Sequence, residues 1–155
     1  MKTDREFALN FGSDVTLIKR REILLTQSND NEVVIYIVRN LLVEAGFRIV
    51  DEFMVASAAS ELATNILRYA GKGTLEIGIV RDTRDTFGIE LFASDTGPGI
   101  RNIEEAMCDR ISTTKNSLGS GLPSVKRIMD EFYIESIPGK GTRVLARKWR
   151  RYGEG

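Results

Sequence analysis

Histidine is absent from this chain of 155 residues. Its absence excludes nucleophilic catalysis by Ser-His or Cys-His pairs and any metal site that is built on imidazole. The chain also cannot carry a phosphoryl group on a histidine of its own. Cysteine is almost absent: Cys108 stands alone, so no internal disulfide can form, and a reducing compartment is the simpler expectation. A lone cysteine is more often a small apolar side chain than a reactive thiol.

The sequence also lacks an excess of one charge and a long apolar run. The 22 Lys and Arg residues balance 22 Asp and Glu residues, so the field of the whole chain favours neither nucleic acid nor an anionic membrane as the main partner. The longest strongly apolar run, residues 33–38, is too short to cross a bilayer. The N-terminal residues 1–10 are charged and lack the apolar core of a signal peptide. We therefore expect a cytoplasmic protein.

What is present is typical of one soluble globular domain. Hydrophobic residues make up 42% of the chain and charged residues 28%. The length fits a single domain over residues 1–155, and a chain of this size buries roughly 68–70% of its unfolded surface. The sequence shows no internal repeat, linker or low-complexity tract.

Hydrophobic spacing and turn residues predict an alternation of strands and helices. Ser28 or Asp30 is expected to cap the first helix, and Gly46 to end it. The order predicts an α/β two-layer sandwich, with helices packed on one face of a mixed, mostly antiparallel sheet. The predicted strands are 15–18, 23–26, 74–81, 87–93, 133–137 and 142–149, and the predicted helices are 32–45, 51–70, 103–108 and 122–132.

The second predicted helix is long because no Gly or Pro interrupts it before Gly71, which gives about five turns. It carries a pair of polar residues, Glu61 and Asn65, whose spacing of four places them on the same helix face. The ordinary interpretation is a solvated face. The functional alternative is a carboxylate that accepts a proton from a hydroxyl, beside an amide oxygen that binds Mg²⁺. The apolar residues expected to face the core are Phe53, Met54, Ala58, Leu62, Ile66 and Ala70.

The sequence has two glycine-rich segments, one after a predicted strand and one before a predicted helix. In the segment Asp95-Thr96-Gly97-Pro98-Gly99-Ile100, a turn explains Asp and one Gly, but two glycines also let the backbone approach a ligand closely. An aspartate there can accept hydrogen bonds from an exocyclic amine. The segment Gly119-Ser120-Gly121-Leu122 precedes a helix, an arrangement that suits phosphate groups. It matches neither a P-loop nor a dinucleotide fingerprint.

The basic segment Arg147-Lys148-Trp149-Arg150-Arg151 is open to two interpretations. It could bind an anion or nucleic acid, but a solvated strand end or a partner surface is the interpretation we favour. Trp149 is expected to pack against the sheet rather than to stack on a base.

Taken in order, these clusters resemble the nucleotide-binding boxes of the GHKL ATPases. That superfamily includes gyrase, heat-shock chaperone ATPases, mismatch-repair proteins, histidine kinases and the anti-sigma serine kinases. The resemblance covers about residues 30–149. The matching segments are Glu61…Asn65 (the N box), Asp95-x-Gly97-x-Gly99, Gly119-x-Gly121 and the late-strand motif Gly139-Lys-Gly141-Thr142.

Within the superfamily, segments 61–66, 69–73 and 121–132 are similar to the RsbT-like switch kinases rather than to the sigma-sequestering RsbW type. The resemblance implies a Mg-ATP-dependent kinase of serine or threonine residues on STAS-domain proteins of the stressosome. On release, such kinases activate a downstream output protein, a phosphatase or another signalling enzyme. Residues 1–14 look like an extension beyond the usual start of the family.

The resemblance also implies a role for each matching residue. Asp95 would accept from the adenine amino group with Thr142 behind it, and Gly97, Gly99 and Ile100 would surround the base. Asn65 would bind Mg²⁺, and Glu61 would orient or deprotonate the acceptor hydroxyl. The phosphate groups would lie against Gly119, Ser120, Gly121 and Leu122. The polar residues 109–119 would form the ATP lid, in which Arg110 and Lys115 are candidates to neutralise the phosphates.

Two other functions remain open at this point. One is a binding module that sequesters a sigma factor and uses the nucleotide as a conformational ligand. The other is an ATPase domain of the topoisomerase or repair type, which we rank last because such machines need a transducer domain.

Overall fold

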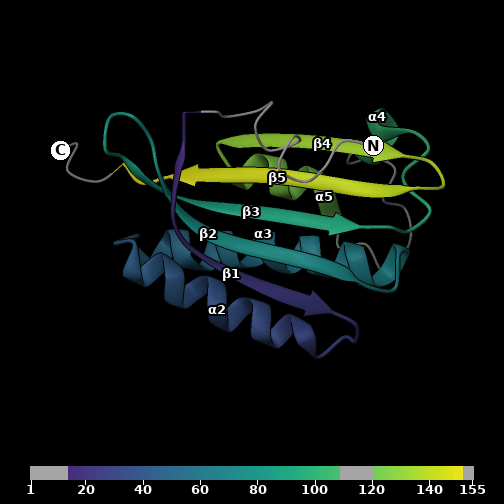
Figure 1. The fold of residues 1–155 in the computed structure, drawn as a ribbon, viewed down its shortest axis with the longest axis horizontal. Helices are drawn as coiled ribbons and strands as arrows, with labels where there is room; N and C mark the ends of the chain where they lie inside the picture. The colour runs from purple at the N-terminus through teal and green to yellow at the C-terminus, as the bar shows by residue number, and fades with distance from the viewer. Residues whose placement is uncertain (1–13, 109–120, 152–155) are drawn as a thin grey trace.

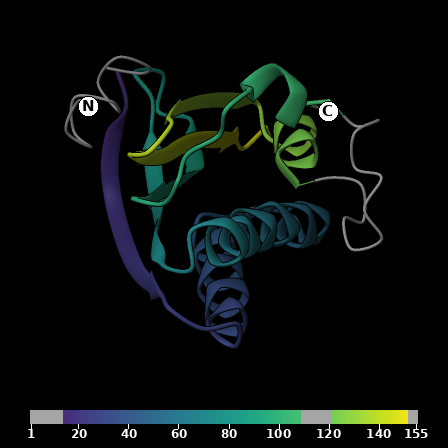
Figure 2. The same ribbon diagram turned by 90° about the vertical axis from the view of Figure 1, so that its right-hand side faces the viewer.

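The computed structural model describes residues 14–108 and 121–151, which form a five-stranded sheet with helices on one of its faces (Figure 1). The strand order is β1-β2-β3-β5-β4, and the view along the sheet shows the two layers (Figure 2). The expected two-layer α/β sandwich is therefore confirmed. The strands are β1 (Thr16–Leu25), β2 (Gly73–Arg81), β3 (Phe87–Asp95), β4 (Glu131–Ile137) and β5 (Gly141–Trp149), and the helices are α2 (Asp30–Glu44), α3 (Ile49–Tyr69), α4 (Ile103–Ala106) and α5 (Gly121–Ile128).

Neighbouring strands in the described sheet are antiparallel at all four junctions, although the sequence had suggested a mixed sheet. The connections explain this. Tight turns join β2 to β3 and β4 to β5, and two helices in succession, α2 and α3, return the chain to the end at which β1 finished. A strand that starts at the end of the sheet where its neighbour finished runs antiparallel to that neighbour.

The strand β1 is continuous, whereas the sequence predicted two short strands separated by a polar stretch. It pairs with β2 from Thr16 to Leu25, with a register irregularity between Leu17 and Lys19. Because β1 is an edge strand, its charged residues project into solvent and form ion pairs there. The Arg20 guanidinium lies 2.6 Å from the Glu76 carboxylate. Polar composition therefore did not interrupt the strand.

The core lies between the sheet and the helices α2, α3 and α5. The inward residues of the strands alternate with outward ones, as Leu75, Ile77 and Ile79 do on β2. Within the described ranges, no helix is long and apolar enough to cross a membrane. The side chains that the helices contribute to this core include Val34, Val38, Leu41 and Leu42 of α2, Val55, Ala58, Ala59, Leu62, Ala63 and Ile66 of α3, and Leu122 and Val125 of α5.

Two residues of α3 that were expected in the core are on the surface. Phe53 is 55% exposed and Met54 is 42% exposed, while Glu52 is buried. The helix is oriented so that its row of buried residues, which begins at Val55, faces the sheet. Phe53 therefore lies at the edge of this buried row, next to α2. There the Arg39 guanidinium stacks 4.5 Å from the centre of the Phe53 ring and pairs with Glu52 at 3.4 Å. Ala58, Leu62 and Ile66 are buried as expected.

The ends of the helices follow the expected signals in part. Gly46 ends α2 with φ of +83°, as predicted. The N-cap residue of α2 is Asn29, not Ser28 or Asp30. The Asp30 carboxylate instead accepts the backbone N–H of Thr26 at 2.9 Å, and this hydrogen bond helps to lower its pKa. The short helix α4 falls within the predicted range.

The helix α5 ends at Ile128, four residues earlier than predicted. Glu131 and Phe132 belong to β4 instead, where they pair with Arg147 and Ala146 of β5. Phe132 packs against the core from this strand. Cross-strand pairing and burial thus override the helical spacing of this segment.

The basic segment at the end of β5 is largely neutralised within the protein, which corrects the expectation of a solvated strand end. Arg147 is only 2% exposed and pairs with Glu90 at 2.7 Å and with Glu131 at 3.4 Å. Trp149 packs over Gly88 in the sheet, as expected, and its indole N–H donates to the Glu131 carboxylate. Each of these contacts lies on the face of the sheet opposite the helices.

Arg150, which follows β5, connects the end of the sheet to the end of α2. Its guanidinium donates to the carbonyl oxygen of Ala45 at 3.1 Å and lies 5.5 Å from the centre of the Phe87 ring. A Cβ on Gly46 would come within 2.5 Å of this guanidinium, so a larger residue would displace the Arg150 side chain in addition to straining a backbone with φ of +83°.

Candidate active site

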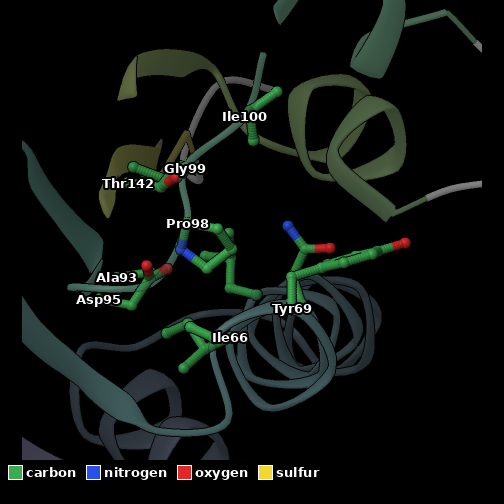
Figure 3. A pocket seen from close by; sticks show the side chains of 12 residues that line it. Ile66, Tyr69, Ala93, Asp95, Pro98, Gly99, Ile100 and Thr142 are labelled. Carbon is green, nitrogen blue, oxygen red and sulfur yellow. The ribbon is translucent and has the colours of Figure 1, made fainter. Parts of the chain in front are cut away.

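A cleft opens between the C-terminal half of α3, the end of β3 and the start of β5 (Figure 3). The empty space in the cleft is about 420 Å³, a volume that includes the open mouth. Asp95 and Thr142 lie on one side of the cleft and Tyr69 on the other (Figure 3). The lining residues are Leu62, Asn65, Ile66, Tyr69 and Ala70 of α3, Ala93 and Asp95 of β3, Pro98, Gly99 and Ile100 of the following turn, and Thr142 and Val144 of β5.

Asp95 ends β3 and is held by backbone groups. Its Oδ1 accepts the N–H of Gly97 at 2.9 Å, and its register partner across the sheet is Thr142. Burial raises the pKa of the Asp95 carboxyl above its ordinary value, although hydrogen bonds from the backbone of Gly97 and Thr142 act in the opposite direction. A partly desolvated carboxylate in a cleft is suited to accept hydrogen bonds from an amine.

The two glycines after Asp95 allow the turn to fit between α3 and the β4–β5 hairpin. A Cβ on Gly97 would lie 2.5 Å from the Cβ of Ala70, at the end of α3. Gly99 has φ of +78°, and a Cβ there would lie 2.5 Å from the carbonyl oxygen of Ile137. Close backbone approach is thus the reason for both glycines. Gly99 lines the cleft, whereas Gly97 supports it from behind.

Ser136, on β4, is a residue of this region that the sequence analysis did not identify. Its Oγ accepts the backbone N–H of Ile100 at 2.6 Å and lies 2.7 Å from Thr142 Oγ1. Asp95, Thr142 and Ser136 are neighbours in register on three adjacent strands, β3, β5 and β4. Nothing in the sequence pointed to Ser136, because a single serine in a strand belongs to no recognisable motif. Only the pairing of Ser136 with Thr142 across the strands places it near the cleft.

Asn65 and Glu61 lie one turn apart on α3, as their spacing predicted. Asn65 lines the cleft, but Glu61 is outside the lining, one turn toward the start of the helix and half-buried. Next to them, Thr64 Oγ1 accepts from the side-chain amide of Asn31 at 3.2 Å, which ties α3 to the start of α2. Tyr69 was not singled out by the sequence analysis; it is 63% exposed at the mouth of the cleft.

The segment expected to bind phosphate groups is described only in part. Gly119, Ser120 and the predicted lid at 109–119, with Arg110 and Lys115, lie outside the described residues. Gly121 begins α5 with φ of +43°, and a Cβ there would meet nothing within 4 Å, so the backbone conformation is what favours glycine. Leu122 is buried in the core, which leaves its backbone as the part available to a ligand.

A divalent cation fits this cleft only if the ligand supplies most of its coordination. Within residues 14–108 and 121–151, no group of three or more acidic, histidine or cysteine side chains is arranged to hold a metal ion. Mg²⁺ keeps several waters and is commonly held by one or two side chains together with substrate phosphates. Asn65, whose side-chain amide carries a carbonyl oxygen at the cleft, meets that requirement.

Comparison with known proteins agrees with this geometry. A family model described as histidine kinase-, DNA gyrase B-, and HSP90-like ATPase matches residues 50–151. The chain is 49% identical over 113 residues to the serine/threonine-protein kinase RsbT of Bacillus subtilis (strain 168), and the match covers 73% of this chain and 84% of that protein. It is 32% identical over 97 residues to an anti-sigma F factor of Caldanaerobacter subterraneus, with 61% and 68% covered.

Among solved structures, the SiaB–SiaC complex from Pseudomonas aeruginosa contains a chain of similar fold. The TM-score is 0.50 at 12% identity, and the superposition covers 96% of this chain and 99% of that one. At this identity the similarity concerns the fold alone.

Proposed function

The chain belongs to the family of histidine kinase-, DNA gyrase B- and HSP90-like ATPases and is a serine/threonine-protein kinase of the RsbT type; we propose that it transfers the γ-phosphoryl group of Mg-ATP to a serine or threonine of a STAS-domain partner. The observation that carries this proposal is the cleft that Asn65 and the pair Asp95 and Thr142 line together. The wall formed by Asp95 and Thr142 suits a base that carries an amino group. The wall that carries Asn65 suits a metal ion bound to phosphate groups.

At the base end, the Asp95 carboxylate would accept from the adenine amino group with Thr142 beside it. Gly99 and Ile100 would lie along the edge of the base, and Gly97 would hold the turn against α3. These roles rest on the lining of the cleft and on the hydrogen bond from Gly97 to Asp95.

At the phosphate end, Gly119 and Ser120 precede α5 in the sequence, and Gly121 is the first residue of that helix. Free backbone N–H groups and the positive end of the helix dipole favour anionic groups at such a site. Asn65 would hold Mg²⁺, which supplies neutralisation of the phosphate charge. Phosphoryl transfer depends mainly on positioning and electrostatic stabilisation, so few protein groups suffice.

In the transfer step, the acceptor hydroxyl oxygen forms a bond to the γ-phosphorus while the bond from that phosphorus to the β,γ-bridging oxygen breaks, and ADP leaves. The proton of the hydroxyl moves to the Glu61 carboxylate, which acts as the general base. Glu61 lies one turn from Asn65 and outside the lining of the cleft, where it would meet the acceptor hydroxyl of a protein substrate rather than the nucleotide.

The same proposal gives the protein a place in a signalling switch. We infer that phosphorylation of the STAS-domain partner releases the kinase, which then activates a downstream output protein, such as a phosphatase or another signalling enzyme. Neither nucleic acid nor a membrane enters this scheme, and a cytoplasmic location stays a prediction.

The test is transfer of label from γ-labelled Mg-ATP to proteins in an extract of the source cells. Wild-type protein is expected to label a discrete band, which then identifies the partner. Glu61→Gln is expected to bind ATP in calorimetry and to label nothing. Glu22→Gln, a matched change at an exposed position of the edge strand β1, serves as the control and is expected to label like wild type.

If Glu61→Gln labels as well as wild type, Glu61 is not the general base. If wild-type protein labels no band although it binds ATP and the extract has first been treated with a phosphatase, the kinase proposal is wrong for this set of substrates.

A second candidate function is sequestration of a sigma factor, because the chain is also similar to anti-sigma F factors. A complex with a sigma factor that forms with ADP or ATP and survives gel filtration would support it. Failure of every sigma factor of the source cell to bind would remove it.

A further inference from the structure

Ser136 has three polar contacts around one hydroxyl group. Its Oγ accepts from Ile100 N–H at 2.6 Å, lies 2.7 Å from Thr142 Oγ1, and is 3.3 Å from the carbonyl oxygen of Gly141. Ser136 does not line the cleft, so it acts on a ligand only through its neighbours.

The donor and acceptor capacity of a hydroxyl decides how these contacts are shared. A serine hydroxyl has one hydrogen to donate and two lone pairs to accept with. The Ile100 N–H can only donate and the Gly141 carbonyl can only accept. Ser136 therefore uses one lone pair for Ile100 and its hydrogen for Gly141, and the second lone pair remains for Thr142.

We assign Thr142 as the donor of the 2.7 Å contact, a direction that the distance alone leaves open between the two hydroxyl groups. In any other arrangement one of the three contacts is not a hydrogen bond. With its hydrogen engaged by Ser136, the Thr142 oxygen presents only lone pairs to the cleft. Its neighbour in register on β3, the Asp95 carboxylate, also presents acceptors.

We propose that Ser136 is a positioning residue which turns the Thr142 hydroxyl into an acceptor toward the cleft and so sets a preference for a purine with an amino group at its 6-position over one with a carbonyl group. An amine donates to both Asp95 and Thr142. A carbonyl oxygen at the same place faces two acceptors, which repel it. This inference rests on the proposed function, because it presumes that the base of ATP lies against Asp95.

The pair of probes that isolates this effect is ATP and ITP, which differ in the group at the 6-position and in the protonation of the adjacent ring nitrogen. Affinities for both are measured by calorimetry, and KM and kcat for both in the transfer assay. Wild type is expected to favour ATP.

In Ser136→Ala, the Thr142 hydroxyl is free to turn and to donate to the carbonyl of ITP. The ratio of ATP affinity to ITP affinity is expected to fall at least about fivefold, the value of one ordinary hydrogen bond. The change is expected in KM rather than in kcat at saturating nucleotide. Ser136→Thr keeps the hydroxyl on a strand position that accepts β-branched residues and is expected to restore the ratio.

Two further variants separate this role from a merely structural one. In Thr142→Val the hydroxyl is absent, so adding Ser136→Ala is expected to leave the ATP-to-ITP ratio where Thr142→Val put it. Ser28→Ala, at an exposed serine before α2, is the matched control and is expected to bind both nucleotides like wild type. Should Ser136→Ala fail to fold, Ser136→Cys replaces it, because a thiol keeps the volume and is a weak acceptor.

An unchanged ratio in a folded Ser136→Ala protein would overturn the inference, as would an equal loss of affinity for both nucleotides. Wild type that binds ATP and ITP equally would also overturn it while leaving the kinase proposal intact. Wild type that binds neither nucleotide would instead refute the proposed function itself.

Discussion

Asp95 and Thr142 are register partners on β3 and β5, and together they form the wall of the cleft that faces α3. The pairing places a carboxylate beside a hydroxyl by means of the sheet itself, so no loop has to close to create the pair. Disturbing either residue should therefore affect nucleotide binding before it affects the fold.

Asp95→Asn is expected to weaken ATP binding by about 10- to 100-fold. The physical reason is the loss of a hydrogen bond to a charged acceptor, which is worth about 1.5–3 kcal/mol. Calorimetric titration with ATP measures the change. The matched control is Asp85→Asn in the β2–β3 turn, where asparagine tolerates the left-handed backbone with φ of +62°. Equal affinity in Asp95→Asn and wild type would remove Asp95 from the site.

The pH dependence of stability should reveal the raised pKa of Asp95. Because burial raises this pKa in the folded protein, the folded state binds more protons than the unfolded state between the ordinary pKa and the raised one. The contribution of Asp95 to the free energy of unfolding therefore falls as pH rises through this interval and is unfavourable above it. The difference in melting temperature between Asp95→Asn and wild type, both without nucleotide, should favour Asp95→Asn most near neutral pH and shrink in acid. A difference that grows in acid would contradict this sign.

Gly99→Ala should destabilise the protein much more than Gly139→Ala. Both glycines have φ near +80°, so an alanine costs backbone strain of about 1–2 kcal/mol at either position. Only at Gly99 does the added Cβ meet a backbone atom, the carbonyl oxygen of Ile137, whereas at Gly139 it meets nothing within 4 Å. Chemical denaturation of the two variants gives the difference directly. Similar losses would show that the turn after Asp95 has room to move.

Arg147→Met should cost about 3–5 kcal/mol of stability, because it leaves the partly buried carboxylates of Glu90 and Glu131 without their shared cation. Arg20→Met removes an exposed guanidinium from an equally short ion pair with Glu76 and should cost no more than about 1 kcal/mol. Urea denaturation of both variants provides the comparison. A small loss for Arg147→Met would mean that the buried pairs contribute little beyond the desolvation they require.

Much of the site could be predicted from the sequence because its signals are local. The interval between Glu61 and Asn65 needed only helix geometry, and Asp95, Gly97 and Gly99 marked a turn whose backbone must lie close to other groups. The comparisons confirmed the family and the enzyme class. The roles of the individual residues stay predictions.

The errors arose where tertiary contacts outweigh local pattern. Phe53 and Met54 fit the helical period, but the phase of α3 on the sheet is set by Val55, Ala58 and Leu62. Ser136 belongs to the site only through its register partner Thr142 on the adjacent strand. The two residues are six apart in the sequence, a spacing that does not by itself indicate contact.

The hydrogen bond from Arg150 to Ala45 connects the last strand to the first described helix. The Arg150 guanidinium donates to a carbonyl oxygen at the end of α2, 105 residues earlier in the sequence. A cation at that position also complements the negative end of the helix dipole. Shortening the protein by the residues after Trp149 would therefore loosen a helix near the opposite end of the sequence. A residue beyond the last strand thus contributes to the stability of α2, and proteolytic removal of Arg150 should first lower the protection of the α2 amides against hydrogen exchange.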